Sequence, residues 1–177
     1  MITHTGSATT PAVPLPRYNK SANGGRGDRA APDSWPTAPL PVDIVLFEGW
    51  MLGFRPQPDA AVAAVDPSLL PVNAALRSYA AAWDAFVGCW LVIEVDDPNY
   101  VYDWRLQAEV RMRAAGKAGM TDEQVKDFVD RYMPAYRAYL PSLYAQGPTT
   151  ARAGHTLFVQ VDEARAPLDV QPQRALE

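Results

Sequence analysis

The sequence predicts an α/β fold, in which helices flank a parallel sheet to give three layers. The first observation is a set of short, mostly apolar runs at residues 42–50, 89–95 and 156–162, of which Ile44–Phe47 is continuously apolar. Such runs are typical of strands buried on both faces. The second observation is that segments with helical signals separate these runs. Strands joined by helical crossovers pair in parallel, so the three runs predict one narrow parallel sheet.

One helix is predicted before the second strand and another after it. The first covers residues 68–87, where Ser68 can cap the helix and an apolar stripe follows at helical spacing. Pro71 falls in its first turn, where proline is tolerated. The second follows Asp97-Pro98, an N-cap residue with proline at the first helical position, and extends to about residue 115.

A third helix is predicted over residues 121–144. Thr121 and Gln124 have the spacing of a capping box, in which each side chain binds the other residue's backbone N–H. Pro134 and Pro141 are expected to kink or shorten this helix. Residues 53–67, which contain several prolines, are predicted to be loop, and the last twelve residues to be frayed.

The composition excludes several classes of protein. The chain has 177 residues, of which 48% are hydrophobic and 20% charged, and this is enough for one domain with a core. A net charge of −4 gives no basis for nucleic-acid binding, and no apolar run is long enough to span a membrane. Cys89 is the only cysteine, so an internal disulfide is impossible; we expect a buried thiol and a reducing compartment.

The first 41 residues are predicted to be extended or looped, and they hold a cluster of basic and polar side chains. Arginine has a planar fork that suits carboxylates and phosphates, so the cluster suits a small anionic substrate. A solvated loop is the alternative reading. The candidate substrate-binding residues are Arg17, Tyr18, Asn19, Lys20, Arg26, Asp28 and Arg29.

Glu48 is the main catalytic candidate. It ends the apolar run Ile44–Phe47, and Gly49 after it permits close approach of a ligand to the backbone. Ligands of open α/β sheets bind at the carboxyl ends of strands. We therefore expect Glu48 beside a Mg²⁺ ion or a phosphate, although a surface carboxylate is the alternative.

A basic helix end interrupted by glycines follows the second strand. Arg105, Arg111 and Arg113 lie on the predicted helix, and Lys117 stands between Gly116 and Gly119. This arrangement is typical of a hinged lid that closes on a charged substrate. A solvated helix face with a glycine cap explains the same pattern.

The glycine-rich phosphate loop is missing from the sequence. Its motif places a glycine six residues before the lysine and Ser or Thr after it. Before Lys117, Arg111 stands where that glycine should be, and Ala118 stands where the hydroxyl residue should be. The other two lysines also fail. A nucleotide site would therefore lack its backbone cradle.

Several longer segments resemble the D-glycerate 3-kinase family. They are Leu15-Pro-Arg-Tyr-Asn-Lys-Ser21, Gly25-Arg-Gly-Asp-Arg29, Val45-Leu-Phe-Glu-Gly-Trp-Met-Leu-Gly-Phe54, Val101-Tyr-Asp-Trp-Arg-Leu-Gln-Ala-Glu109, Gly119-Met-Thr-Asp-Glu-Gln124 and Val129-Asp-Arg-Tyr-Met-Pro-Ala-Tyr136. The matches cover roughly residues 14–166 in one order. More distantly the chain is similar to the uridine kinase and phosphoribulokinase group of P-loop kinases.

The resemblance implies transfer of phosphate from ATP, with Mg²⁺, to the 3-hydroxyl of D-glycerate, a step of photorespiration in the chloroplast. It implies that Glu48 and Arg105 are catalytic, and that Glu48 is near the metal. It implies that Arg111, Arg113 and Lys117 approach the nucleotide phosphates from a lid. Small molecules are then the partners, without nucleic acid or membrane. Outside plants the implied compartment is the cytoplasm.

Two departures from the family pattern qualify these expectations. Asn19 stands where the family has aspartate. The family's first strand and phosphate loop should also precede Leu15, so we expect a domain incomplete at its N-terminus and little or no ATP turnover by this chain alone. Residues 1–41 are then the acceptor segment, 42–166 part of a P-loop kinase-like domain and 167–177 a flexible tail. The missing part could also be a partner subunit.

Two alternative functions remain open at this stage. One is a non-catalytic module that binds glycerate or a partner. The other is a fragment of a kinase that acts on uridine or pantothenate.

Overall fold

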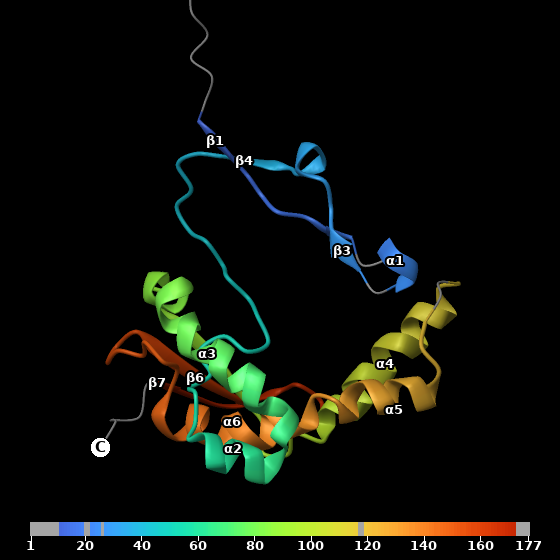
Figure 1. Ribbon diagram of the computed structural model, residues 1–177, viewed down its shortest axis with the longest axis vertical. Helices are drawn as coiled ribbons and strands as arrows, with labels where there is room; N and C mark the ends of the chain where they lie inside the picture. Colours follow the sequence, from blue (N-terminus) through green and yellow to red (C-terminus); the bar gives the residue numbers. More distant parts are fainter. Residues whose placement is uncertain (1–10, 20–21, 26, 117–118, 173–177) are drawn as a thin grey trace, which may run out of the picture. The chain divides into compact units, whose positions relative to one another are not determined.

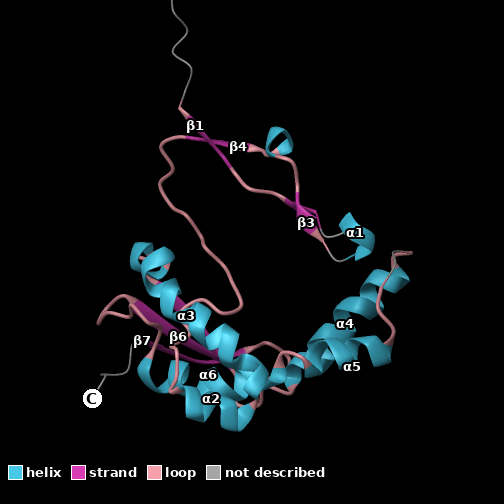
Figure 2. Cartoon of the chain, viewed as in Figure 1, coloured by secondary structure: helices cyan, strands magenta, loops and turns pink. Residues whose placement is uncertain are grey.

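The computed structural model describes residues 11–19, 22–25, 27–116 and 119–172 (Figures 1 and 2). The chain divides into two compact units, Met1–Glu48 and Gly49–Glu177. None of the helices in the described part of the chain is long and apolar enough to cross a membrane.

The first unit consists of short elements joined by loops. They are β1 (Ala12–Pro14), β2 (Tyr18–Asn19), α1 (Ala22–Gly25), β3 (Asp28–Arg29), η1 (Pro32–Ser34) and β4 (Thr37–Pro39). β1 pairs with β4 and β2 with β3, both antiparallel. Its strand residues are mostly exposed, so this unit has little core of its own.

The second unit carries the α/β fold. Its elements are α2 (Asp59–Val65), η2 (Pro67–Leu69), α3 (Leu70–Ala82), η3 (Asp84–Phe86), β5 (Trp90–Glu94), α4 (Tyr100–Ala114), α5 (Asp122–Asp130), α6 (Met133–Gln146), β6 (Thr156–Val161) and β7 (Pro167–Pro172). The sheet order is β5-β6-β7, with β5 and β6 parallel and β6 and β7 antiparallel. The predicted α/β class and the parallel pairing of the second and third strands are confirmed.

The predicted strand over residues 42–50 is wrong. Residues 44–49 have no regular secondary structure. Ile44, Val45 and Leu46 are 75–90% exposed, and Phe47 is 53% exposed. A strand is stable only beside another strand, and no described strand pairs with this segment.

Prolines start the helices more often than they interrupt them. Pro71 lies in the first turn of α3, as predicted, although the side chain that caps the preceding turn is Asp66 rather than Ser68. The predicted helix 121–144 is two helices, because helical structure is interrupted at Arg131 and Tyr132 and α6 begins at Met133, with Pro134 in its first turn. The capping box of Thr121 and Gln124 is confirmed.

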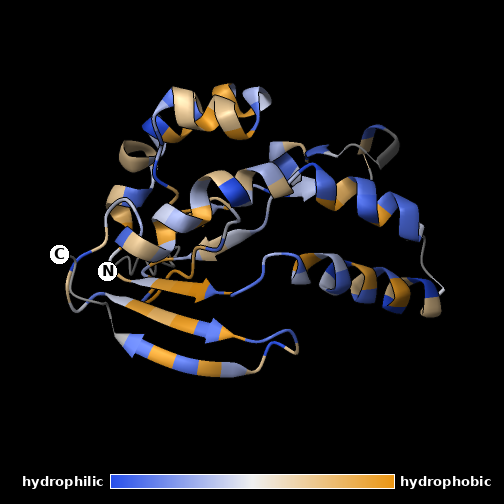
Figure 3. Ribbon diagram, turned by 90° about the horizontal axis from the view of Figure 1, so that it is seen from below, coloured by the Kyte–Doolittle hydropathy of each residue, from blue (hydrophilic) through white to orange (hydrophobic). Residues whose placement is uncertain are grey.

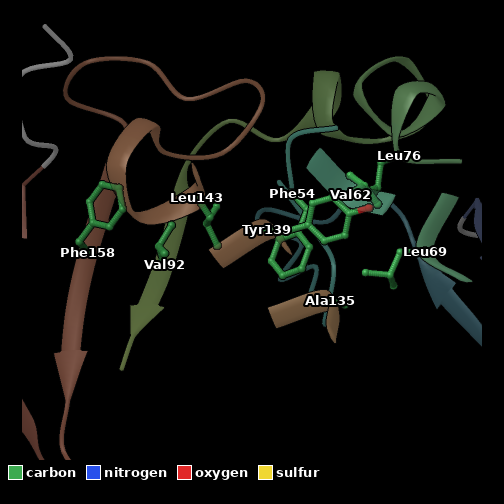
Figure 4. Packing of buried hydrophobic residues seen from close by; sticks show 9 residues of the cluster. All are labelled: Phe54, Val62, Leu69, Leu76, Val92, Ala135, Tyr139, Leu143 and Phe158. Carbon is green, nitrogen blue, oxygen red and sulfur yellow. The ribbon is translucent and has the colours of Figure 1, made fainter. Parts of the chain in front are cut away.

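One hydrophobic core joins α6 to the sheet (Figure 4). Val92 of β5 and Phe158 of β6 point to the same face and meet Leu143 of α6. Tyr139, one turn earlier on α6, packs among residues from α2, η2 and α3. The core is formed by Phe54, Val62, Leu69, Leu76, Val92, Ala135, Tyr139, Leu143 and Phe158.

Asp84 is a fully buried carboxyl at the start of η3. Its side chain accepts a hydrogen bond from Thr149 Oγ1, and its carbonyl accepts one from Thr150 Oγ1 at 3.0 Å. Burial raises the pKa of Asp84 above its ordinary value, and the bond from Thr149 offsets only part of this. The folded state therefore binds this proton more tightly than the unfolded chain.

Asp84→Asn is expected to flatten the pH dependence of stability. In the native protein the contribution of Asp84 to the free energy of unfolding falls as pH rises from about 3.9 through the raised pKa. The variant should therefore gain stability relative to the native protein between roughly pH 4 and pH 7. Urea unfolding across this range measures the difference.

Asp66→Asn provides a control of opposite sign. Hydrogen bonds from Ser68, above all from its side chain and then from its backbone N–H at 2.8 Å, lower the pKa of Asp66. This contribution is present above the unfolded pKa and is lost as pH falls, so Asp66→Asn should lose stability relative to the native protein as pH rises. If the stability difference from the native protein changed with pH in the same direction for both variants, the opposite pKa shifts of Asp84 and Asp66 would be contradicted.

Candidate functional site

The predicted acceptor cluster lies on the β2–β3 hairpin. The register places Tyr18 opposite Arg29 and Asn19 opposite Asp28. Ala30 N–H donates to the carbonyl of Arg17 at 2.8 Å, which extends the pairing by one step. The hairpin thus brings together five of the seven predicted substrate-binding residues. Lys20 and Arg26 lie outside the described residues.

Hydrogen bonds fix the orientation of the acidic side of the hairpin. Asp28 accepts a bond from Asn23 Nδ2 at 3.3 Å and one from Arg29 N–H at 2.7 Å. The guanidinium of Arg29 lies over the ring of Trp35, 5.8 Å from its centroid. Trp35 Nε1 in turn donates to the carbonyl of Ala30 at 2.8 Å. Arg29 is therefore positioned by stacking as well as by the strand.

Gly27 permits the hairpin to close beneath Tyr18. Its φ is +80°, a conformation that favours glycine, and a Cβ there would lie 2.3 Å from Tyr18 Oη. Any side chain at this position would displace the tyrosine ring. The close approach therefore fixes where Tyr18 can stand in the acceptor cluster.

Gly27→Ala is expected to weaken binding of a small anionic acceptor by about tenfold or more, which corresponds to about 1.4 kcal/mol. The displaced Tyr18 ring and the strained backbone are the cause. Titration of D-glycerate, followed by NMR, measures the change. Gly154→Ala is the matched control, because Gly154 has φ +74° but no atom within 4 Å of its Cβ position. Equal loss in both variants would contradict a role for Tyr18.

Glu48 is exposed and follows Ile44–Phe47, which form no strand in the structure. The expected strand-end position is therefore not formed. Among the described residues, no group of three or more His, Cys, Asp or Glu side chains could hold a metal ion. A metal role for Glu48 stays a prediction.

The predicted lid is a hairpin of α4 and α5, which lie side by side (Figure 1). Arg113 near the end of α4 donates to the carbonyl of Met120 at 3.0 Å and to Asp122 Oδ1 at 2.9 Å. These bonds tie the loop between the helices to α4. Arg111 is exposed on the same helix, and Lys117 lies outside the described residues.

Arg105 is held within the hairpin. It forms an ion pair with Glu109, one helical turn later, and its guanidinium lies 5.0 Å from the centre of the Phe128 ring. Glu109 is almost completely buried and also accepts a bond from Met120 N–H at 2.9 Å. Arg105 therefore has a positioning role in this unit, and a catalytic role for it stays a prediction.

Two side-chain pairs were not predicted from the sequence. The four-residue spacing of Arg105 and Glu109 is a signal that could have identified the first pair. The second is Cys89 and His155, whose Sγ and Nδ1 atoms are 3.7 Å apart. Cys89 is exposed, which corrects the expectation of a buried thiol. No sequence spacing indicates that pair, because parallel pairing of β5 with β6 creates it.

The second unit combines a parallel strand pair packed against α6 with a helical hairpin that carries arginines, and comparison with known proteins finds kinases with this fold. The chain is 55% identical over 154 residues to the chloroplastic D-glycerate 3-kinase of Arabidopsis thaliana. This alignment covers 87% of this chain and 34% of the relative. It is 43% identical over 136 residues to a probable ATP-dependent kinase, TDA10, of Saccharomyces cerevisiae. That alignment covers 72% of this chain and 45% of the yeast relative.

A solved structure gives the same result for the fold. The D-glycerate 3-kinase of Cryptococcus neoformans superimposes with a TM-score of 0.80 at 33% identity, over 92% of this chain and 60% of that one. No protein-family model matches the chain. The chain is thus similar to D-glycerate 3-kinases in sequence and fold, and it spans between about a third and three fifths of their length.

Proposed function

We propose that this chain supplies the acceptor-binding and lid parts of an ATP-dependent D-glycerate 3-kinase, which forms 3-phospho-D-glycerate. The observation that carries the proposal is the 55% identity to the Arabidopsis relative over 87% of the chain. ATP as the phosphate donor is supported by the name of the yeast relative. A chloroplast location extends the proposal from the Arabidopsis relative's name, and a role in photorespiration extends it from the family resemblance in the sequence.

The acceptor role belongs to the β2–β3 hairpin in this proposal. Arg17 and Arg29 would bind the glycerate carboxylate, because guanidinium groups form paired hydrogen bonds with carboxylates. Tyr18 and Asn19 would orient the hydroxyl groups, and Asp28 would hold the loop in place. Lys20 and Arg26 would add positive charge to the same segment.

The phosphate role belongs to the residues of the second unit and to Glu48. Phosphate transfer depends mostly on positioning and on neutralising charge, and Arg105, Arg111, Arg113 and Lys117 would provide the cations. Mg²⁺ usually binds proteins through one or two carboxylates together with the nucleotide phosphates. Glu48 would be the carboxylate, with the ion arriving on ATP.

Acceptor binding can be tested with this chain alone. Addition of D-glycerate should shift the NMR signals of Tyr18, Asn19 and Arg29, and L-glycerate should bind more weakly by about tenfold, or about 1.4 kcal/mol. Arg29→Ala should remove the shifts, whereas Arg131→Ala, which changes an exposed arginine on the second unit, should preserve them. Equal binding of both enantiomers would contradict a specific glycerate site.

A further inference from the structure

The turn between β6 and β7 carries an arginine in a left-handed backbone conformation. Arg165 has a φ of +63°, and its N–H donates to the carbonyl of Asp162 at 2.9 Å. Ala166 N–H donates to Asp162 Oδ1 at 2.7 Å, which completes the turn. Hairpin turns of this kind usually have glycine at the left-handed position, because other residues are strained there. An arginine at such a position needs an explanation in what its side chain contacts.

The side chain of Arg165 reaches helix α4. Its Cζ atom lies 4.9 Å from the centre of the Trp104 ring, and its Nη1 donates to Gln107 Oε1 at 3.3 Å. Trp104 Nε1 donates to the carbonyl of Glu163, in the same turn, at 2.6 Å. We call these contacts between the turn and α4 the clasp. Figure 3 shows the turn at the end of the sheet where α4 begins.

The clasp holds one face of α4. Tyr100, Trp104 and Gln107 are spaced four and three residues apart along the helix, so they share a face. The ring of Tyr100 lies 6.0 Å from that of Trp104, measured between centroids. Val101 and Leu106, on another face, pack against the buried cluster of α5 and α6. α4 is therefore held by the clasp on one face and by α5 and α6 on another.

The clasp matters because the α4–α5 hairpin has non-helical connections at both ends. Residues 95–99 join it to β5, and Arg131 and Tyr132 join it to α6. Changes in φ and ψ at a few such residues can tilt two packed helices together as one body. Packing against α6 alone leaves this tilt possible, whereas an attachment on a second face opposes it. The β6–β7 turn provides that attachment.

We propose that Arg165 is a positioning residue, which holds the α4–α5 hairpin in one orientation relative to the β5-β6-β7 sheet. Arg105, Arg111 and Arg113 lie on α4. The clasp therefore sets the direction from which their guanidinium groups meet a nucleotide phosphate. This consequence for phosphate transfer rests on the proposed function, whereas the clasp itself does not.

Arg165→Ala and Arg165→Gly test the clasp in this chain without any substrate. Both variants remove the guanidinium group, so a cation–π contact and a hydrogen bond are lost. Hydrogen exchange of the Trp104 indole N–H should therefore become about tenfold faster in each variant. Residual dipolar couplings of the α4 and α5 amides should no longer fit the orientation that the amides of the sheet define.

The two variants differ in the backbone of the turn. Glycine fits the left-handed conformation and alanine does not, so Arg165→Gly should have the higher urea midpoint of the two. Relief of turn strain should not restore the couplings, because the guanidinium group is absent from both variants. Arg152→Ala is the matched control and should leave the couplings unchanged. Arg152 is also exposed and donates to a loop carbonyl, that of Gly88 at 3.2 Å, but it lies outside the clasp.

Two results would overturn the proposal. One is an orientation of the α4–α5 hairpin that stays the same in Arg165→Ala and Arg165→Gly. The other is a change of orientation in the alanine variant that is absent from the glycine variant, because strain in the turn would then be its cause. Failure of the native chain to bind D-glycerate would contradict the proposed function and leave the clasp standing.

Discussion

Tyr139→Ala is expected to lower the free energy of unfolding of the second unit by about 3–5 kcal/mol, the usual cost of removing a buried aromatic side chain. Tyr139 has no exposed surface and lies where α6 meets α2 and α3. Its ring lies 5.7 Å from that of Phe54, measured between centroids. A cavity there would remove packing contacts between these helices, so urea unfolding should report the whole loss in the free energy of unfolding.

Tyr139→Phe separates packing from hydrogen bonding. The Tyr139 hydroxyl donates to Asn73 Oδ1 at 3.3 Å, and Asn73 Oδ1 also accepts a bond from Gln57 N–H at 2.9 Å. Because Asn73 keeps that second partner, Tyr139→Phe should cost only about 0.5–1.5 kcal/mol. Equal losses in the alanine and phenylalanine variants would contradict a packing role for the ring.

Glu109→Ala is the second change with a large expected effect. It removes the acceptor of Met120 N–H and the charge partner of Arg105, both inside the α4–α5 hairpin. Breaking a buried ion pair costs about 3–5 kcal/mol. Because Arg105 is partly exposed, we expect about 2–3 kcal/mol here, together with faster hydrogen exchange of the Met120 amide.

The loop after α4 is the part that Glu109 holds. A Cβ at Gly119 would lie 3.0 Å from Glu109 Oε2 and 3.0 Å from Arg113 Cγ, so the loop passes close to α4 at this point. Glu123→Gln on the same hairpin is the control, since Glu123 is exposed and should cost less than about 1 kcal/mol. An unchanged Met120 amide in Glu109→Ala would contradict our account.

The sequence was most informative where local signals agree with the final environment. The apolar runs at β5 and β6 become strands because they pair with each other and pack against α6. The run Ile44–Phe47 is also apolar but forms no strand, because strand formation depends on a neighbouring strand that the local sequence does not specify. The helix α2 was missed because prolines flank it, although Pro58 at its N-cap position is compatible with a helix start.

Strand β7 shows a different limit of sequence patterns. Its residues include Pro167, Asp169 and Pro172, which are poor strand formers. An edge strand tolerates proline at its ends, so pairing with β6 decides its structure. No local pattern reports that pairing, and the segment was expected to be a tail.

The sequence identified several residues of the candidate site but not how they are arranged in space. The early basic cluster could be identified from residue types, but its arrangement on a hairpin depends on Gly27 and on the β2–β3 pairing. Glu109 was missed because a buried carboxylate is recognised by its neighbours in space, namely Arg105 and Met120.

The most direct test of our account is phosphate transfer by this chain together with the part of the Arabidopsis relative that it does not match. This chain and the unmatched part of the Arabidopsis relative would be mixed with Mg-ATP and D-glycerate, and the product followed by ³¹P NMR. We predict 3-phospho-D-glycerate from the mixture and little from either part alone. A stable complex that phosphorylates a different acceptor, or none, would contradict the proposed function.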